Sequence, residues 1–278
     1  MNINGTNSKE VRNDPRGGYV AVNGLSMYYE VHGIGEPLVL LHGGFMTIDA
    51  FGPLLPSLAQ FRQVIAIELE GHGRTADLDR PLSVEQMAED VVVLLDQIGI
   101  RRADFFGFSM GGMVSLRIAI RHAERVSRLV AVSTPYNIEG YLPSVVAGWP
   151  GMTPEVLAGT PMEQVYAQTA PDPDHWPVFV AKMRASLMSF KGWPDSDIQS
   201  IQSPTFIILG DADLIRLEHG VKMFRLLAGE KIEAGMGELP KSQLAVLPGT
   251  SHFSILYRLD LLLPVIMPFL GVPVPEAS

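Results

Sequence analysis

Residues 103–111 read Ala-Asp-Phe-Phe-Gly-Phe-Ser-Met-Gly, and they are the most informative segment of the chain for its fold. The apolar run that ends near Phe106 predicts a buried strand, and a helical pattern continues to about His122. Between them, residues 107–111 match the G-x-S-x-G pattern of a sharp turn from a strand into a helix. Glycines permit such a turn, and the serine hydroxyl then stands exposed beside a helix N-terminus. The pattern alone is common in turns, but its position here makes Ser109 a candidate nucleophile.

Further strands are predicted along the whole chain. Residues 19–31 favour two antiparallel edge strands around the turn residues Asn23 and Gly24. Continuous apolar runs, typical of strands buried on both faces of a sheet, occupy residues 37–42, 63–68, 127–132, 204–210 and 243–248.

Helical patterns lie between these runs, most clearly at residues 84–98, where apolar side chains recur at a spacing of 3.6 residues. Ser83 and Gln86 form a capping-box pattern before this helix, and Gly99 follows it where a left-handed C-terminal cap is expected. Strands that alternate with helices predict an α/β fold, with a mostly parallel sheet that helices cover on both faces.

The alternation breaks between residues 134 and 202, where prolines are frequent. All three tryptophans lie in this segment, namely Trp149, Trp176 and Trp193. We interpret residues 134–202 as a helical cap or lid over a pocket, although ordinary packing would also explain the tryptophans. Residues 19–133 and 203–278 are then the core, and residues 1–18 are a polar N-terminal leader.

A serine nucleophile needs a base, and the base needs an acid that fixes its orientation. Asp213 comes just after the run at residues 204–209, at the edge of the sheet where catalytic groups gather, so we expect it to be the acid. Asp211 is the rival, with a loop hydrogen bond as its structural alternative. His252 follows the last predicted strand and precedes a helical pattern from residue 253 to 270, and it is the expected base.

An oxyanion-binding site is predicted at residues 42–45, His-Gly-Gly-Phe, which follow another buried run. The backbone N–H groups of Gly44 and Met110 are the expected donors. The sequence leaves open whether Gly44 or Phe45 supplies the first donor, and whether the glycines merely allow a tight turn.

Composition excludes several classes of protein. With 278 residues, 47% of them hydrophobic, and a net charge of −9, the chain can bury a large core and would repel a nucleic acid. The chain has no cysteine, which excludes thiolate sites, and no cluster with metal-ligand spacing, so we expect no metal and no cofactor. The apolar stretch at residues 261–274 is too short to cross a bilayer, and we expect a cytoplasmic protein without membrane contact.

Five segments together resemble the α/β-hydrolase superfamily, and the resemblance covers nearly the whole chain. They are residues 42–44, 71–75, 107–111, 210–213 and 249–252. The chain is most similar to small, cofactor-free bacterial esterases and lactonases with a helical cap, among them N-acyl-homoserine lactonases and carboxylesterases. That resemblance implies an eight-stranded sheet, an inserted cap and acyl-enzyme chemistry.

By the same resemblance the substrate is a small apolar ester or lactone. Candidate pocket residues, each of which is equally well explained as ordinary core, are Phe45, Met110, Trp149, Met152, Trp176 and Trp193. A C–C bond hydrolase or a cofactor-free haloperoxidase would carry the same triad, so both stay open. A ligand-binding receptor on this fold is the alternative of another class, and a homodimer is left open.

Overall fold

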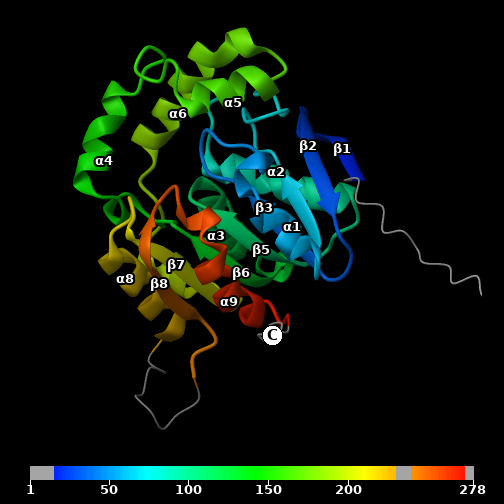
Figure 1. The fold of residues 1–278 in the computed structure, drawn as a ribbon, viewed down its shortest axis with the longest axis vertical. Helices are drawn as coiled ribbons and strands as arrows, with labels where there is room; N and C mark the ends of the chain where they lie inside the picture. The colour runs from blue at the N-terminus through cyan, green and yellow to red at the C-terminus, as the bar shows by residue number, and fades with distance from the viewer. Residues whose placement is uncertain (1–15, 230–238, 273–278) are drawn as a thin grey trace, which may run out of the picture.

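A computed structural model describes residues 16–229 and 239–272 of the chain. Its centre is an eight-stranded sheet with the order β1-β2-β4-β3-β5-β6-β7-β8 (Figure 1). The strands are β1 (Arg16–Val22), β2 (Leu25–His32), β3 (Pro37–Leu41), β4 (Gln63–Ile67), β5 (Ala103–Phe108), β6 (Val126–Val132), β7 (Thr205–Ala212) and β8 (Gln243–Ser251). Only the pairs β1–β2 and β2–β4 are antiparallel within this sheet, so the predicted α/β-hydrolase architecture is confirmed.

Alternating side chains of the central strands face two separate cores. Phe105 belongs to the core under α2 (Val84–Gln97), α3 (Met110–Arg121) and α8 (Leu217–Ala228). Its neighbour Phe106 belongs to the core under α1 (Leu54–Ala59) and α9 (Leu259–Phe269). Every residue of β5 is buried, which explains its continuous apolar sequence.

Helix α2 begins and ends as predicted, with one difference at its start. The Ser83 hydroxyl accepts the N–H of Gln86, and Gly99 after the helix has a φ of 79°. The Gln86 side chain does not return to the Ser83 backbone, because it donates to Asp90 at 3.0 Å instead. The expected capping box is therefore only half formed.

The segment between β6 and β7, residues 134–202, is built of short helices, and we call it the insert. It contains η3 (Ile138–Gly140), α4 (Pro143–Gly148), η4 (Trp149–Gly151), α5 (Pro161–Thr169), η5 (Pro173–His175), α6 (Trp176–Ser189) and α7 (Asp195–Gln199). Figure 1 shows α4, α5 and α6 grouped at the top of the view, above the sheet. Phe45, which follows β3, packs against Trp176 and Phe179 of α6, so the insert covers loops at the carboxyl ends of the strands.

Some boundaries differ from the sequence prediction. Strand β1 already begins at Arg16, so the last three residues of the expected leader pair with β2, and residues 1–15 lie outside the described chain. The expected helix at residues 253–270 is divided into η7 (Ile255–Tyr257) and α9. Within the described residues, no helix has the length and apolar character needed to cross a membrane.

Candidate active site

Ser109 occupies a strained turn between β5 and α3. Its φ of 51° and ψ of −115° lie in a region that residues with a side chain rarely adopt. The Ser109 N–H donates to the carbonyl of Val132 at 2.9 Å, which ties the turn to β6. A Cβ on Gly107 would lie only 2.5 Å from the carbonyl oxygen of Gly111, so the first glycine of the motif is required by close packing.

His252 lies directly after β8 and reaches Ser109 across the edge of the sheet. Its Nε2 is 3.1 Å from the Oγ of Ser109, and its Nδ1 is 2.7 Å from Oδ1 of Asp213. A neutral imidazole that donates from Nδ1 to the carboxylate presents Nε2 as the acceptor for the serine proton. The ring is buried, with the aromatic ring of Phe108 centred 5.1 Å away.

Asp213 is the carboxylate that contacts the histidine, and Asp211 is not. Besides His252, Asp213 accepts hydrogen bonds from the Ser133 hydroxyl and from the N–H groups of Gly210 and Ile215. Burial by itself would raise the pKa of Asp213, but its hydrogen bonds, chiefly that with His252, outweigh burial and lower the pKa. Asp211 instead accepts the N–H groups of Gly249 and Thr250, which is the structural alternative expected for it.

Gly44, the first predicted oxyanion donor, lies next to the side chains of Met110 and Met183. A Cβ on Gly44 would lie 3.9 Å from the Sδ of Met110 and 3.0 Å from the Cε of Met183, so a side chain at position 44 would crowd the site. Within the described chain, the N–H groups of Gly44 and Phe45 donate to no protein acceptor. Met110 is the first residue of α3, where a backbone N–H has no partner inside the helix. The geometry is compatible with either residue 44 or residue 45 as the first donor.

His42 fixes the loop that carries these donors. Its Nδ1 donates to the carbonyl of Gly43 at 2.8 Å, and its Nε2 accepts the N–H of Leu69 at 3.2 Å. Burial lowers its pKa to about 4, so the ring stays neutral near pH 7 and keeps both bonds. Phe45, two residues beyond Gly43, has a φ of 60°, which is a strained value for a residue other than glycine.

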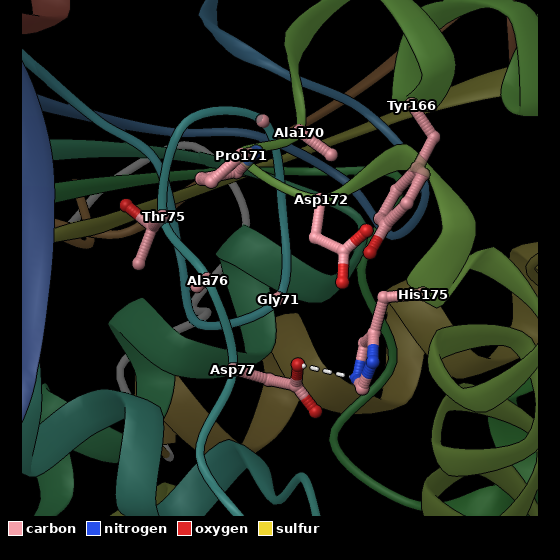
Figure 2. Close-up of a pocket in the computed structure, with 10 residues that line it drawn as sticks. Gly71, Thr75, Ala76, Asp77, Tyr166, Ala170, Pro171, Asp172 and His175 are labelled. Atoms are coloured by element: carbon pink, nitrogen blue, oxygen red, sulfur yellow. Dashed lines mark ion pairs between the residues drawn. The ribbon is translucent and has the colours of Figure 1, made fainter.

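Two cavities lie between the core and the insert and share Gly73 and Tyr166. The larger has a volume of about 180 Å³ and is bounded by the loop at residues 71–77 and by residues 166–175 of the insert (Figure 2). In Figure 2, Asp77 and His175 point toward each other, and Nε2 of His175 lies 2.9 Å from Oδ1 of Asp77. The smaller cavity leads from Tyr166 to Phe45, beside the proposed oxyanion loop.

The candidate pocket residues separate into two groups. Phe45 lines the smaller cavity, and Trp176 packs against it with ring centroids 6.0 Å apart. Trp176 itself, like Trp149, Met152 and Trp193, lines neither cavity. Trp149 packs edge-on against Tyr141 and so stabilises the insert internally. The Nε1 of Trp193 donates to Glu85 of α2, which connects the insert to the core.

Three residues at the site were missed from the sequence. Ser133 donates to Asp213, while Asp77 and Tyr166 line the larger cavity. Ser133 directly follows a buried strand at the catalytic edge, which is a signal that could have found it. Asp77 and Tyr166 lie in a loop and in the insert, where no periodic pattern marks them. In the part of the chain that the structure describes, no group of three or more His, Asp or Glu side chains is arranged to hold a metal ion.

The sequence pattern of the alpha/beta hydrolase family matches residues 38–262, which include Ser109, Asp213 and His252. The chain belongs to the alpha/beta hydrolase family. This membership agrees with the sheet order, the strained serine after β5 and the histidine after β8.

Individual relatives of this chain are more distant. The chain is 35% identical to the pimeloyl-[acyl-carrier protein] methyl ester esterase of Yersinia enterocolitica over 134 residues, which is 48% of each protein. The matched segments cover 40%, 44% and 48% of the first three curated relatives, so the chain matches about half of their length or less.

Solved structures show the same fold over almost the whole chain. The enol-lactonase from Burkholderia xenovorans LB400 superposes with a TM-score of 0.70 at 22% identity, over 91% of this chain and 99% of that one. Est816, described as an N-acyl homoserine lactone degrading enzyme, superposes with a TM-score of 0.69 at 23% identity, over 90% and 99%. At these identities the likeness establishes the fold and leaves the substrate open.

Proposed function

We propose that this hydrolase cleaves small carboxylic esters or lactones through an acyl-enzyme on Ser109. The observation that carries the proposal is the continuous contact from Ser109 through His252 to Asp213, at 3.1 Å and 2.7 Å. A serine in this arrangement can lose its proton to the histidine while it attacks a carbonyl carbon. The esterase and lactonase names among the similar proteins support the same class of substrate.

In the first half of the reaction, the Ser109 oxygen bonds to the carbonyl carbon and its proton moves to Nε2 of His252. The carbonyl oxygen becomes negative and accepts hydrogen bonds from the N–H group of Met110 and from that of Gly44 or Phe45. When the ester bond breaks, His252 gives its proton to the departing oxygen, and the acyl group stays on Ser109. Asp213 stabilises the imidazolium throughout this half-reaction.

In the second half, water attacks the acyl carbon and gives a proton to His252, which then returns it to Ser109. The products are a carboxylic acid and an alcohol, or a single hydroxy acid when the substrate is a lactone. The aromatic side chains of Phe45, Trp176 and Phe179 favour an apolar acyl or alcohol group next to the reacting carbonyl.

The test is turnover by the purified protein and by Ser109→Ala. The panel contains p-nitrophenyl esters of increasing acyl length, an N-acyl-homoserine lactone and a ring-cleavage dienone. Ester or lactone turnover that Ser109→Ala abolishes supports the proposal, with Ser57→Ala as the matched control, because the half-buried Ser57 hydroxyl on α1 bonds only the Pro53 carbonyl among the described residues. Turnover of the dienone alone would replace the ester assignment by C–C bond hydrolysis. A wild type inert on the whole panel, or an active Ser109→Ala, would overturn the proposal.

A further inference from the structure

Ser133 lies where β6 ends and the insert begins, and its hydroxyl is directed at the proposed catalytic acid. The Oγ of Ser133 is 2.5 Å from Oδ2 of Asp213, and Ser133 is completely buried. Its backbone N–H donates to the carbonyl of Ile208 at 2.8 Å, which fixes it to β7. The contact therefore joins two neighbouring strands at the edge of the sheet where the triad lies.

The two oxygens of Asp213 have different partners. Oδ1 accepts hydrogen bonds from Nδ1 of His252 and from the N–H of Ile215. Oδ2 accepts them from the Ser133 hydroxyl and from the N–H of Gly210. A carboxylate can only accept, so the Ser133 hydroxyl is the donor. With Oδ2 held by Ser133 on one strand and by Gly210 on the next, the carboxylate cannot rotate, and Oδ1 stays directed at Nδ1 of His252.

The backbone of Ser133 is held in an unusual conformation. Its φ of 52° lies in the left-handed region, which disfavours residues with a Cβ. The following residue, Thr134, donates from its Oγ1 to the carbonyl of Val132 and packs where Gly112 of α3 has no side chain. Strained backbone conformations that the surrounding contacts hold in place are concentrated at functional sites, where the orientation of a side chain matters.

We propose that Ser133 is a positioning residue of the triad, which holds the Asp213 carboxylate in the orientation that His252 needs. This inference rests on the proposed function of Ser109, His252 and Asp213. Ser133 is itself no nucleophile, since the only side-chain partner of its hydroxyl among the described residues is the carboxylate. Among the described residues, the side chains that contact the Asp213–His252 pair are those of Ser109, Ser133, Phe108 and Phe253, none of which carries a charge.

The decisive variant is Ser133→Gly, because glycine accepts a φ of 52° and removes only the hydroxymethyl group. We expect kcat to fall roughly ten- to hundred-fold with KM little changed, which corresponds to the loss of one hydrogen bond to a charged group. The acid limb of the kcat/KM profile moves to higher pH, since a carboxylate with one donor fewer holds the imidazolium more strongly. The double variant Ser133→Gly with Asp213→Asn should have a kcat little lower than that of Asp213→Asn alone.

The matched control is Ser115→Ala, because Ser115 is equally buried and its hydroxyl donates to the carbonyl of Gly111 instead of the triad. Thermal unfolding of each variant verifies the fold. The far-downfield proton resonance of the His252 Nδ1–H reports the same contact without any substrate, so it still tests Ser133 if no ester is turned over. A folded Ser133→Gly protein with wild-type kcat, pH profile and resonance would overturn the inference, whereas inertness of the wild type would overturn only the proposed function.

Discussion

The Oγ of Ser109 and the Nε2 of His252 lie 3.1 Å apart although 143 positions separate the two residues in the sequence. The contact exists because Ser109 follows β5 and His252 follows β8, and both strands run in the same direction in the sheet. Their carboxyl ends therefore meet at one edge, where Asp213 after β7 lies between them in strand order. This is how a parallel sheet assembles a site from distant segments.

We expect His252→Gln to lower kcat by roughly 10⁴-fold or more, because among the described residues no other base contacts the Ser109 hydroxyl. Binding of an uncleaved substrate analogue should change little. Ester turnover and covalent labelling of Ser109 by a fluorophosphonate would measure the loss. His122→Gln, at the half-buried end of α3 and in contact with Glu89, is the control, and an equal fall in both variants would contradict the assignment of the base.

The two neighbouring aspartates give a matched pair of variants. Asp213→Asn should lower kcat by roughly 10⁴-fold, since an amide can donate to Nδ1 and so favour the wrong tautomer of His252. Asp211→Asn weakens only the bonds to the N–H groups of Gly249 and Thr250, so we expect kcat within a few-fold of wild type. If Asp211→Asn proved the more damaging, the acid would have been placed on the wrong residue.

Close packing at the serine turn should be visible in stability. A Cβ on Gly112 would overlap the Oγ1 of Thr134, and we expect Gly112→Ala to lower the free energy of unfolding by about 1–3 kcal/mol. Gly148 at the end of α4 has open space around it and a right-handed helical backbone, so Gly148→Ala should be neutral or slightly stabilising. Urea unfolding of both variants makes the comparison, and equal stabilities would refute the packing argument.

The sequence alone was sufficient to predict the strands of the core and the polar residues at their ends, because the patterns that indicate them are local. An apolar run before G-x-S-x-G, and runs that end just before Asp213 and His252, each place one side chain at the end of one strand. The sequence favoured Asp213 over Asp211 as the acid, and the fold adds the physical reason, since Asp213 contacts His252 and Asp211 accepts the N–H of Gly249.

The contacts of the insert could not be predicted from the sequence, because its apolar residues follow no regular spacing. Trp193 contacts Glu85 across 108 positions, and nothing near either residue predicts the pair. The larger cavity likewise depends on how the loop at residues 71–77 meets residues 166–175. Ser133 could have been found by asking which polar residues follow the neighbouring strand β6 at the same edge.

Asp77 joins that loop to the insert, and its removal should loosen the contact. Its carboxylate contacts the Lys182 ammonium of α6 and lies 2.9 Å from Nε2 of His175. Asp77→Asn leaves the partly buried Lys182 without its counter-ion, and we expect a loss of about 1–3 kcal/mol and faster proteolysis within the insert. Asp260→Asn, which breaks an exposed ion pair with Arg258, is the control and should change little. Unchanged proteolysis in Asp77→Asn would show that other contacts hold the insert.

Stability should fall as the pH drops below about 6.5, because three histidines are buried in their neutral form. Burial lowers the pKa of His42 to about 4, of His72 to about 3 and of His219 to about 4. In the unfolded chain these rings bind protons near pH 6.5, so between pH 6.5 and 4 the unfolded state holds more protons than the folded one. Each histidine then lowers the free energy of unfolding by up to roughly 1.4 kcal/mol per pH unit.

His72 is the residue to vary, because its Nδ1 donates to the carbonyl of Glu70 at 2.9 Å and an asparagine amide can make the same bond. Its Nε2 has no partner in the described chain, so His72→Asn leaves no broken bond behind. We expect His72→Asn to lose less stability between pH 7 and pH 5 than wild type. Urea unfolding at intervals across this range measures both slopes. A His72→Asn slope equal to that of wild type would mean that His72 takes up its proton in the folded protein as readily as in the unfolded chain.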